Sequence, residues 1–214
     1  MKYKALFFDF DGVIADSVEV KTRAFAALFK AYGPDIQARV VAHHRANGGM
    51  TRKDKFKHYH EAFLEKPLDA AGLENLCKQF SELVVDEVVA SAEIPGANGI
   101  LKKWSASVPC FVVSATPDDE IVAIVARRGL SGYFREVLGS GRNKTENLTY
   151  LLEKYKISPE TGLFFGDAAS DYQAAMNCGV DFMGILPGPD APLLEFAPDI
   201  DWVRNFTEVD FLYD

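Results

Sequence analysis

The chain has 214 residues, which predicts one core domain of ordinary size that carries a modest insertion. Hydrophobic residues make up 48% and charged residues 25%, so the composition excludes disordered and collagen-like chains. Lys and Arg number 23 against 31 Asp and Glu, which gives a net charge of -8. We therefore expect no nucleic-acid partner, because nucleic-acid binding needs clustered positive charge.

The cysteines and the apolar segments indicate a cytoplasmic protein. Cys77, Cys110 and Cys178 form no CxxC pair, so reduced thiols are expected rather than disulfides or a zinc site. The N-terminal apolar run meets Asp9 and Asp11 too early for a signal peptide, and no apolar stretch reaches the roughly 18 residues of a membrane helix. We expect no membrane partner, and either a monomer or a homodimer.

The first half of the chain predicts one strand followed by helices. Residues 4–10 form an apolar run that ends in acids, which indicates a parallel strand buried on both faces. Apolar residues at helical spacing predict a helix over 17–32, which Gly33 and Pro34 end. From about residue 35 to 91 the pattern stays helical, with an apolar stripe of period 3.6 in its second half.

The second half alternates between strands and helices. Strands are predicted at 108–114, 135–138, 162–166 and 180–185, with a possible edge strand at Trp202-Val203, and helices at 117–128, 144–155 and 170–178. This alternation predicts a doubly wound α/β core with a Rossmann-like parallel sheet, which the first strand must join. Residues 1–16 and 92–214 are therefore expected to form the core, and residues 17–91 a helical cap inserted after the first strand.

Polar side chains follow four of the predicted strands, at the sheet edge where ligands bind in open parallel sheets. They are Asp9 and Asp11, then Ser114 and Ala115, then Lys144, and then Asp167 and Asp171. Several acids crowded at one edge repel each other, and a bound Mg²⁺ would relieve that repulsion because it prefers carboxylate and carbonyl oxygens. Lys144, the Ser114 hydroxyl and backbone N–H groups near Ala115 could then hold a phosphate group.

These motifs resemble those of a known family. The segments DFDGVIADS at 9–17, Ser114-Ala115-Thr116, Lys144 and GDAASD at 166–171 resemble the four motifs of the haloacid dehalogenase-like (HAD) superfamily, in the same order. The helical insertion after the first motif resembles the cap of the phosphoglycolate phosphatase and β-phosphoglucomutase branch.

The resemblance implies a role for each matching residue. Asp9 would be the nucleophile that forms an aspartyl-phosphate, and Asp11 the general acid and then the general base. Asp9, the backbone carbonyl of Asp11, and Asp167 would hold Mg²⁺, with Asp171 supporting the metal waters or orienting Lys144. The transferring phosphoryl group would be bound by Ser114, Ala115 and Lys144.

The basic segment at 43–56 of the predicted cap could face the site when the cap closes. It has paired glycines, a hydroxyl and several cations. We hypothesise that Arg45, Thr51 and Arg52 contact the leaving group of the substrate. The alternative is a solvated basic helix face.

The resulting prediction is a Mg²⁺-dependent phosphatase that hydrolyses a small phosphorylated metabolite, such as a sugar phosphate or a phosphoglycolate-like ester. Haloacid dehalogenases and phosphonoacetaldehyde hydrolases resemble this pattern but lack the second acid, so Asp11 argues against both. The second class uses a cap lysine, and Lys53 and Lys55 keep it from being excluded by cap chemistry alone. A β-phosphoglucomutase-like phosphohexomutase needs the same acid, so this function remains an alternative. A non-catalytic phospho-receiver or regulatory protein is the alternative from another class.

Overall fold

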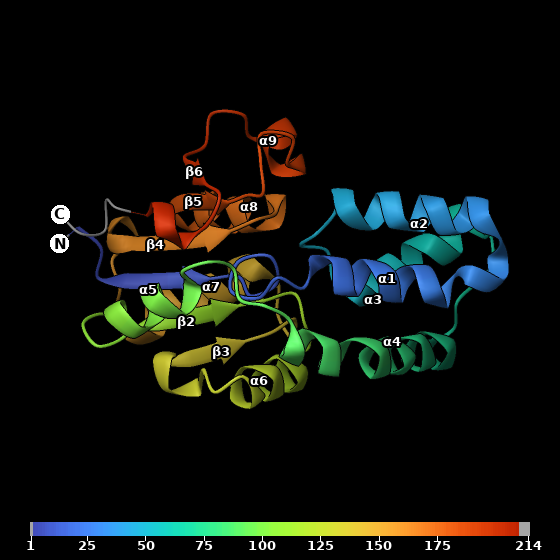
Figure 1. Ribbon diagram of the computed structural model, residues 1–214, viewed down its shortest axis with the longest axis horizontal. Helices are drawn as coiled ribbons and strands as arrows, with labels where there is room; N and C mark the ends of the chain where they lie inside the picture. The colour runs from blue at the N-terminus through green and yellow to red at the C-terminus, as the bar shows by residue number, and fades with distance from the viewer. Residues whose placement is uncertain (1, 210–214) are drawn as a thin grey trace.

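A computed structural model describes residues 2–209 and shows one parallel sheet of six strands in the order β3-β2-β1-β4-β5-β6 (Figure 1). The strands are Ala5–Phe8 (β1), Cys110–Val113 (β2), Glu136–Leu138 (β3), Gly162–Gly166 (β4), Asp181–Ile185 (β5) and Trp202–Val203 (β6). β1 pairs with β2 on one side and with β4 on the other. The strand order reverses there, so the loops that leave β1 and β4 diverge and open a crevice.

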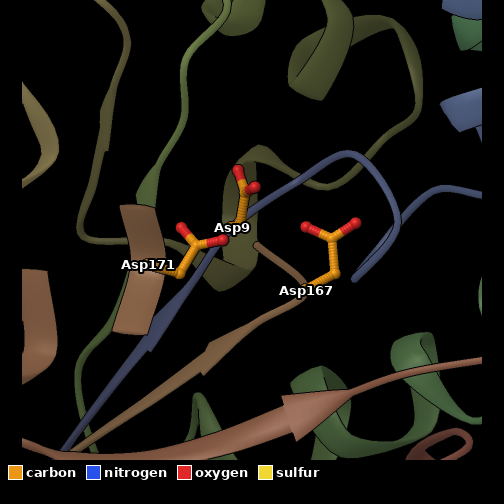
Figure 2. A group of neighbouring side chains, drawn as sticks. All are labelled: Asp9, Asp167 and Asp171. Atoms are coloured by element: carbon orange, nitrogen blue, oxygen red, sulfur yellow. The ribbon is translucent and has the colours of Figure 1, made fainter. Parts of the chain in front are cut away.

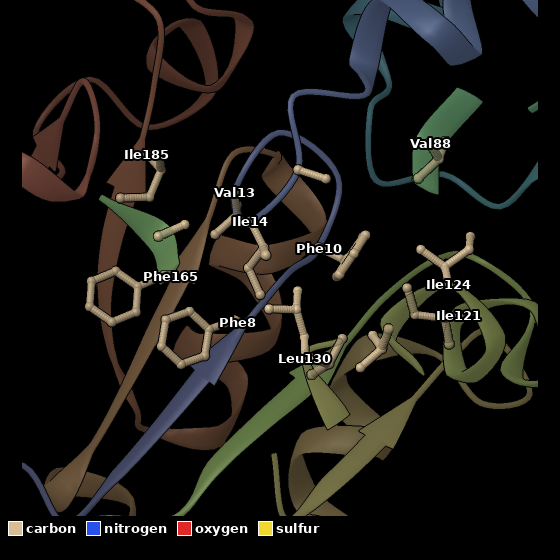
Figure 3. Packing of buried hydrophobic residues seen from close by; sticks show 14 of the residues in the cluster. Phe8, Phe10, Val13, Ile14, Val88, Ile121, Ile124, Leu130, Phe165 and Ile185 are labelled. Carbon is tan, nitrogen blue, oxygen red and sulfur yellow. The ribbon is translucent and has the colours of Figure 1, made fainter. Parts of the chain in front are cut away.

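Both faces of the sheet are buried in apolar cores, as the continuous apolar run of β1 predicts. Phe7 stacks between Phe111 and Phe164 on one face, with ring centroids 5.3 and 6.4 Å away. On the other face Phe8 stacks on Phe165 at 5.1 Å, and Figure 3 shows these two rings together. The first face is covered by Lys144–Tyr155 (α7) and Ala169–Cys178 (α8), the second by Ala97–Trp104 (α5) and Asp118–Arg127 (α6). The doubly wound α/β class is thus confirmed.

Four helices lie at the end of the sheet where β1 terminates, and we call them the cap helices (Figure 1). They are Val18–Leu28 (α1), Pro34–Ala46 (α2), Arg52–His58 (α3) and Ala70–Ala90 (α4). Phe25 is central to their packing, with ring centroids 5.4 Å from Phe56 and 4.3 Å from Phe80. Val88 of α4 carries this apolar core on to Ile124 of α6 (Figure 3). The division at residues 17 and 91 stays a prediction.

The elements differ from expectation in a few places. The first cap helix ends at Leu28 and is followed by a short 3-10 helix, Lys30–Tyr32 (η1), before Gly33 adopts a φ of 92°. α5 and the short helix Pro192–Phe196 (α9) were not predicted. The remaining short elements are a π-helical turn at Tyr59–Phe63 (η2) and 3-10 helices at Ser131–Tyr133 (η3), Pro159–Thr161 (η4) and Phe206–Glu208 (η5). Within residues 2–209, every helix is too short or too polar to cross a membrane.

Candidate active site

Three carboxylates meet at the carboxyl ends of β1 and β4. Asp9 directly follows β1, and its backbone N–H donates to the carbonyl of Phe165 at 2.9 Å, which continues the pairing with β4. Asp167 follows β4, and Asp171 lies in the first turn of α8. Figure 2 shows the three side chains gathered in front of the two strand ends. One oxygen from each carboxylate lies within 4.8 Å of the others.

The turn after Asp11 depends on glycine. Gly12 has a φ of 81°, in the left-handed region that favours glycine. A Cβ at this position would also overlap the carboxylate of Asp167. Gly12 therefore lets the loop after β1 lie directly against the end of β4, which brings the two motifs together.

Lys144 is the counter-charge of this cluster. Its Nζ lies 2.8 Å from Asp9 Oδ2 and 2.5 Å from Asp171 Oδ1. Burial raises the pKa of Asp167 well above its ordinary value, and the neighbouring Asp9 and Asp171 raise it further. Burial also raises the pKa of Asp171, although Lys144 opposes this. Three carboxylates facing one ammonium group leave negative charge to be balanced, and these hard oxygen donors fit a divalent cation such as Mg²⁺.

The Asp11 carboxylate turns toward the first cap helix instead. It accepts hydrogen bonds from Ser17 Oγ at 2.6 Å, from Thr116 Oγ1 at 3.2 Å and from Lys21 Nζ. Burial alone would raise the pKa of Asp11, but Lys21 and these hydrogen bonds outweigh it and hold the pKa below its ordinary value. Asp11 is therefore a carboxylate at neutral pH. Sequence reasoning missed Lys21, whose signal is its spacing of one helical turn from Ser17.

The candidate phosphate ligands lie at the ends of β2 and β3. Ser114 follows β2, and its hydroxyl is buried and accepts from the backbone N–H of Thr116 at 3.1 Å. Lys144 is the first residue of α7, whose start is fixed by a capping box between Asn143 and Glu146. Ser114, Ala115 and Lys144 line a shared groove, as their positions after successive strands predict.

A small cavity of about 50 Å³ lies between the carboxylates and the cap helices. Asp9, Asp11 and Asp167 line it from the sheet, and Lys21, His44 and Lys55 line it from the cap helices. His44 and Lys55 belong to the segment 43–56 that was predicted to face the site, but neither was among the residues chosen as substrate contacts. The sequence does contain a signal that Lys55 is buried. It shares one face of a helix with Phe56 and Tyr59, because these residues recur at helical spacing, and Arg52 lies on the same face.

The three cap residues predicted to contact the leaving group lie in different places. Arg52 lines the cavity, but its guanidinium pairs with Glu120 and donates to Ser81 Oγ at 2.6 Å. Thr51 caps α3 and lines the groove beside Ser114. Arg45 is exposed and pairs with Glu19 at 3.1 Å. Contact of these residues with a substrate stays a prediction.

Comparison with known proteins identifies the family. The model of haloacid dehalogenase-like hydrolases matches residues 3–179. The fructose-1-phosphate phosphatase of Escherichia coli is 27% identical over 193 residues, which cover 86% of this chain and 97% of that protein. Phosphoglycolate phosphatase 1 of Pseudomonas aeruginosa is 24% identical over 209 residues, covering 92% and 75%. The structure of β-phosphoglucomutase from Clostridium difficile superposes with a TM-score of 0.80 at 19% identity, covering 99% and 95%.

The chain belongs to the haloacid dehalogenase-like hydrolases. The expectations of this superfamily and of an enzyme are thereby confirmed, and the curated relatives include phosphoglycolate phosphatases, as expected for the predicted branch.

Proposed function

We propose that this protein is a Mg²⁺-dependent phosphatase that hydrolyses a small phosphomonoester through an aspartyl-phosphate on Asp9. One observation carries the proposal: Asp9 meets Asp167, Asp171 and Lys144 at one sheet edge, with carboxylate oxygens within 4.8 Å of one another. Relatives named as fructose-1-phosphate, phosphoglycolate and 6-phosphogluconate phosphatases support this class of substrate.

The carboxylate cluster suits a magnesium ion, with Asp9, Asp167 and the backbone carbonyl of Asp11 as its ligands. Bound Mg²⁺ would neutralise charge on the phosphoryl oxygens. Asp171 would hold Lys144 in place through the 2.5 Å contact between them. Lys144, Ser114 and the N–H group of Ala115 would bind the remaining phosphoryl oxygens.

The chemistry divides between Asp9 and Asp11. The negative charge of the arriving phosphate group would raise the pKa of Asp11, so that Asp11 takes up a proton as the substrate binds. A carboxylate oxygen of Asp9 would attack phosphorus while the bond from phosphorus to the leaving oxygen breaks, and Asp11 would give that oxygen its proton. Water would then attack the aspartyl-phosphate, and Asp11 would take the proton of the water. Ser17, Thr116 and Lys21 hold Asp11 ionised, which is the form this second half-reaction requires.

The decisive variant is Asp9→Asn. We expect phosphate release to fall by at least about 10³-fold while the melting temperature and circular dichroism stay near those of the wild type, because the amide keeps the shape and loses the nucleophile. Asp16→Asn, which alters an exposed acid of the same loop, is the matched control and should stay within about twofold. Turnover by Asp9→Asn at the wild-type rate would refute the proposal.

A panel of phosphomonoesters, assayed for free phosphate and for isomerised sugar phosphate, separates the alternatives. Free phosphate supports the phosphatase. Isomerisation without phosphate release would indicate the phosphohexomutase. A phosphorylated Asp9 that never turns over would indicate a receiver or regulatory protein. The cytoplasmic location and the choice between monomer and homodimer stay predictions from the sequence.

A further inference from the structure

Lys55 is a buried lysine beside the reaction site. It lies on the inner face of α3 with 2% of its surface exposed, and it lines the cavity shared with Asp9, Asp11 and Asp167. Its Nζ lies 2.7 Å from Nδ1 of His44 and 5.5 Å from the centre of the Phe25 ring. Burial lowers the pKa of His44 to about 3, so its imidazole is neutral and Nδ1 can accept a hydrogen bond from the ammonium form of Lys55.

The other two cations of the cap helices at this cavity already have acidic partners. Lys21 pairs with Asp11, and Arg52 pairs with Glu120. Within residues 2–209, no carboxylate lies at salt-bridge distance from Lys55, whose hydrogen-bond partner is the neutral imidazole. A buried ammonium group without a carboxylate paired to it is costly, so an anion from outside the protein would be bound favourably at Lys55.

The electrostatics agree with this geometry. Burial lowers the pKa of Lys55 to about 7, repulsion from Lys21 contributes, and the nearby Asp167 and Asp11 partly oppose the shift. Burial also lowers the pKa of His44 to about 3, with Lys55 adding to the effect. His44 is therefore a neutral acceptor that orients Lys55, and an arriving anion would favour the ammonium form of Lys55.

We propose that Lys55, oriented by His44, binds a carboxylate on the leaving group, so that the substrate is a short phosphomonoester of a hydroxy acid. This inference rests on the proposed phosphatase function. It places the phosphoryl group at Asp9 and Lys144, on the sheet side of the cavity, and the carboxylate at Lys55, on the cap side.

The shape of the cavity favours a short leaving group. Asp9 and Lys55 line the same small cavity, so few carbons would separate a phosphoryl group at Asp9 from a carboxylate at Lys55 with the cap helices in this position. Among the substrates named for the relatives, phosphoglycolate carries its carboxylate on a short chain, 6-phosphogluconate carries one on a longer chain, and fructose 1-phosphate has none.

Two esters of equal length test the proposal: 2-phosphoglycolate and 2-hydroxyethyl phosphate, which has an alcohol in place of the carboxylate. We expect the wild type to prefer the acid in kcat/KM. Lys55→Met should lower kcat/KM for the acid by about 10- to 100-fold, the usual worth of a hydrogen bond to a charged group, and much less for the alcohol. The loss should fall mainly on KM, because the carboxylate does not change during the reaction.

Lys57→Met is the matched control, since Lys57 is an exposed lysine on the same helix. It should keep the preference of the wild type, and melting curves of both variants check that each is folded. Equal kcat/KM for the two esters in the wild type, or a preference retained by Lys55→Met, would overturn the role of Lys55 and leave the phosphatase intact. Release of phosphate from none of the panel esters would instead overturn the proposed function.

Discussion

Lys144 stays charged although it is buried. Burial lowers its pKa, but Asp171 and Asp9 more than reverse this and raise the pKa above its ordinary value. Its ammonium group therefore balances part of the carboxylate charge at every pH at which the enzyme is expected to work. The remaining charge lies on Asp167 and Asp171, whose pKa values are both raised.

This imbalance predicts how pH and Mg²⁺ act on stability. A carboxyl group whose pKa is higher in the folded state keeps its proton there after the unfolded chain has lost it. The raised pKa values of Asp167 and Asp171 therefore stabilise the metal-free protein fully at a pH below the ordinary carboxyl pKa. This stabilisation is lost as pH rises from there toward neutrality. Mg²⁺ needs the ionised carboxylates, so its stabilising effect should be larger at pH 8 than at pH 5. At 100 times its Kd, Mg²⁺ should add about 2.7 kcal/mol.

Melting curves in EDTA and in saturating MgCl₂ at the two pH values measure this effect. Asp167→Asn removes one of the raised carboxyls, so its metal-free melting temperature should depend less steeply on pH in that range, and Mg²⁺ should stabilise it little. Equal Mg²⁺ shifts at both pH values would contradict the charge imbalance inferred for the cluster.

Three helices from different parts of the chain meet at one buried ion pair. Arg52 of α3 binds Glu120 of α6 through its two terminal guanidinium nitrogens, and Ser81 of α4 donates to Glu120 Oε2 at 2.7 Å. The two charged side chains are 6% and 9% exposed. The pair therefore ties two cap helices to a helix of the sheet, at the edge of the cavity.

Breaking this pair should be costly. Glu120→Ala leaves Arg52 buried without a partner, and we expect a loss of about 3–5 kcal/mol in the free energy of unfolding measured with urea. Glu87→Ala breaks the exposed pair with Arg23 and should cost less than about 1 kcal/mol. The double variant Glu120→Leu/Arg52→Met should be more stable than Glu120→Leu alone, because no unpaired buried charge remains. Equal losses for Glu120→Ala and Glu87→Ala would contradict the role given to the buried pair.

The elements differ in how far the sequence could predict them. β1 and β4 were predictable because strands buried on both faces are continuously apolar, and their ends located Asp9 and Asp167. α5 was not predicted because it is short and contains Gly99, so its stability comes from packing against the sheet. Whether Lys55 faces solvent or a cavity depends on how α3 lies over the sheet. The periodicity of the helix sequence alone does not predict that placement.

At the scale of the whole molecule, the cap helices and the sheet touch beside the reaction site. The turn with paired glycines between α2 and α3 lies against the start of α8, where a Cβ on Gly49 would overlap Ser170 Oγ. A Cβ on the neighbouring Gly48 would meet Ala168 Cβ at an ordinary 3.7 Å. Gly49 thus sets how closely the two parts of the molecule approach, and with it the distance from Lys55 to the carboxylates.

Substitution of Gly49 tests whether this close approach is needed for turnover. Gly49→Ala should keep the cap helices from closing fully and lower kcat/KM by about 10- to 100-fold, since displacements near 1 Å can cost about that much. The free energy of unfolding should change little, because the turn is not in the left-handed region. Steady-state kinetics on the best panel ester measure the effect, with Gly48→Ala expected to stay within about twofold.

The double variant Gly49→Ala/Ser170→Gly tests whether a steric clash with Ser170 causes the loss of kcat/KM in Gly49→Ala. Removing the Ser170 side chain takes away the atoms that the new methyl group would overlap and leaves Ala168 Cβ at 3.3 Å, so most of the lost kcat/KM should return. Ser170→Gly alone supplies the reference rate. Wild-type kinetics in Gly49→Ala would show that turnover does not need this contact.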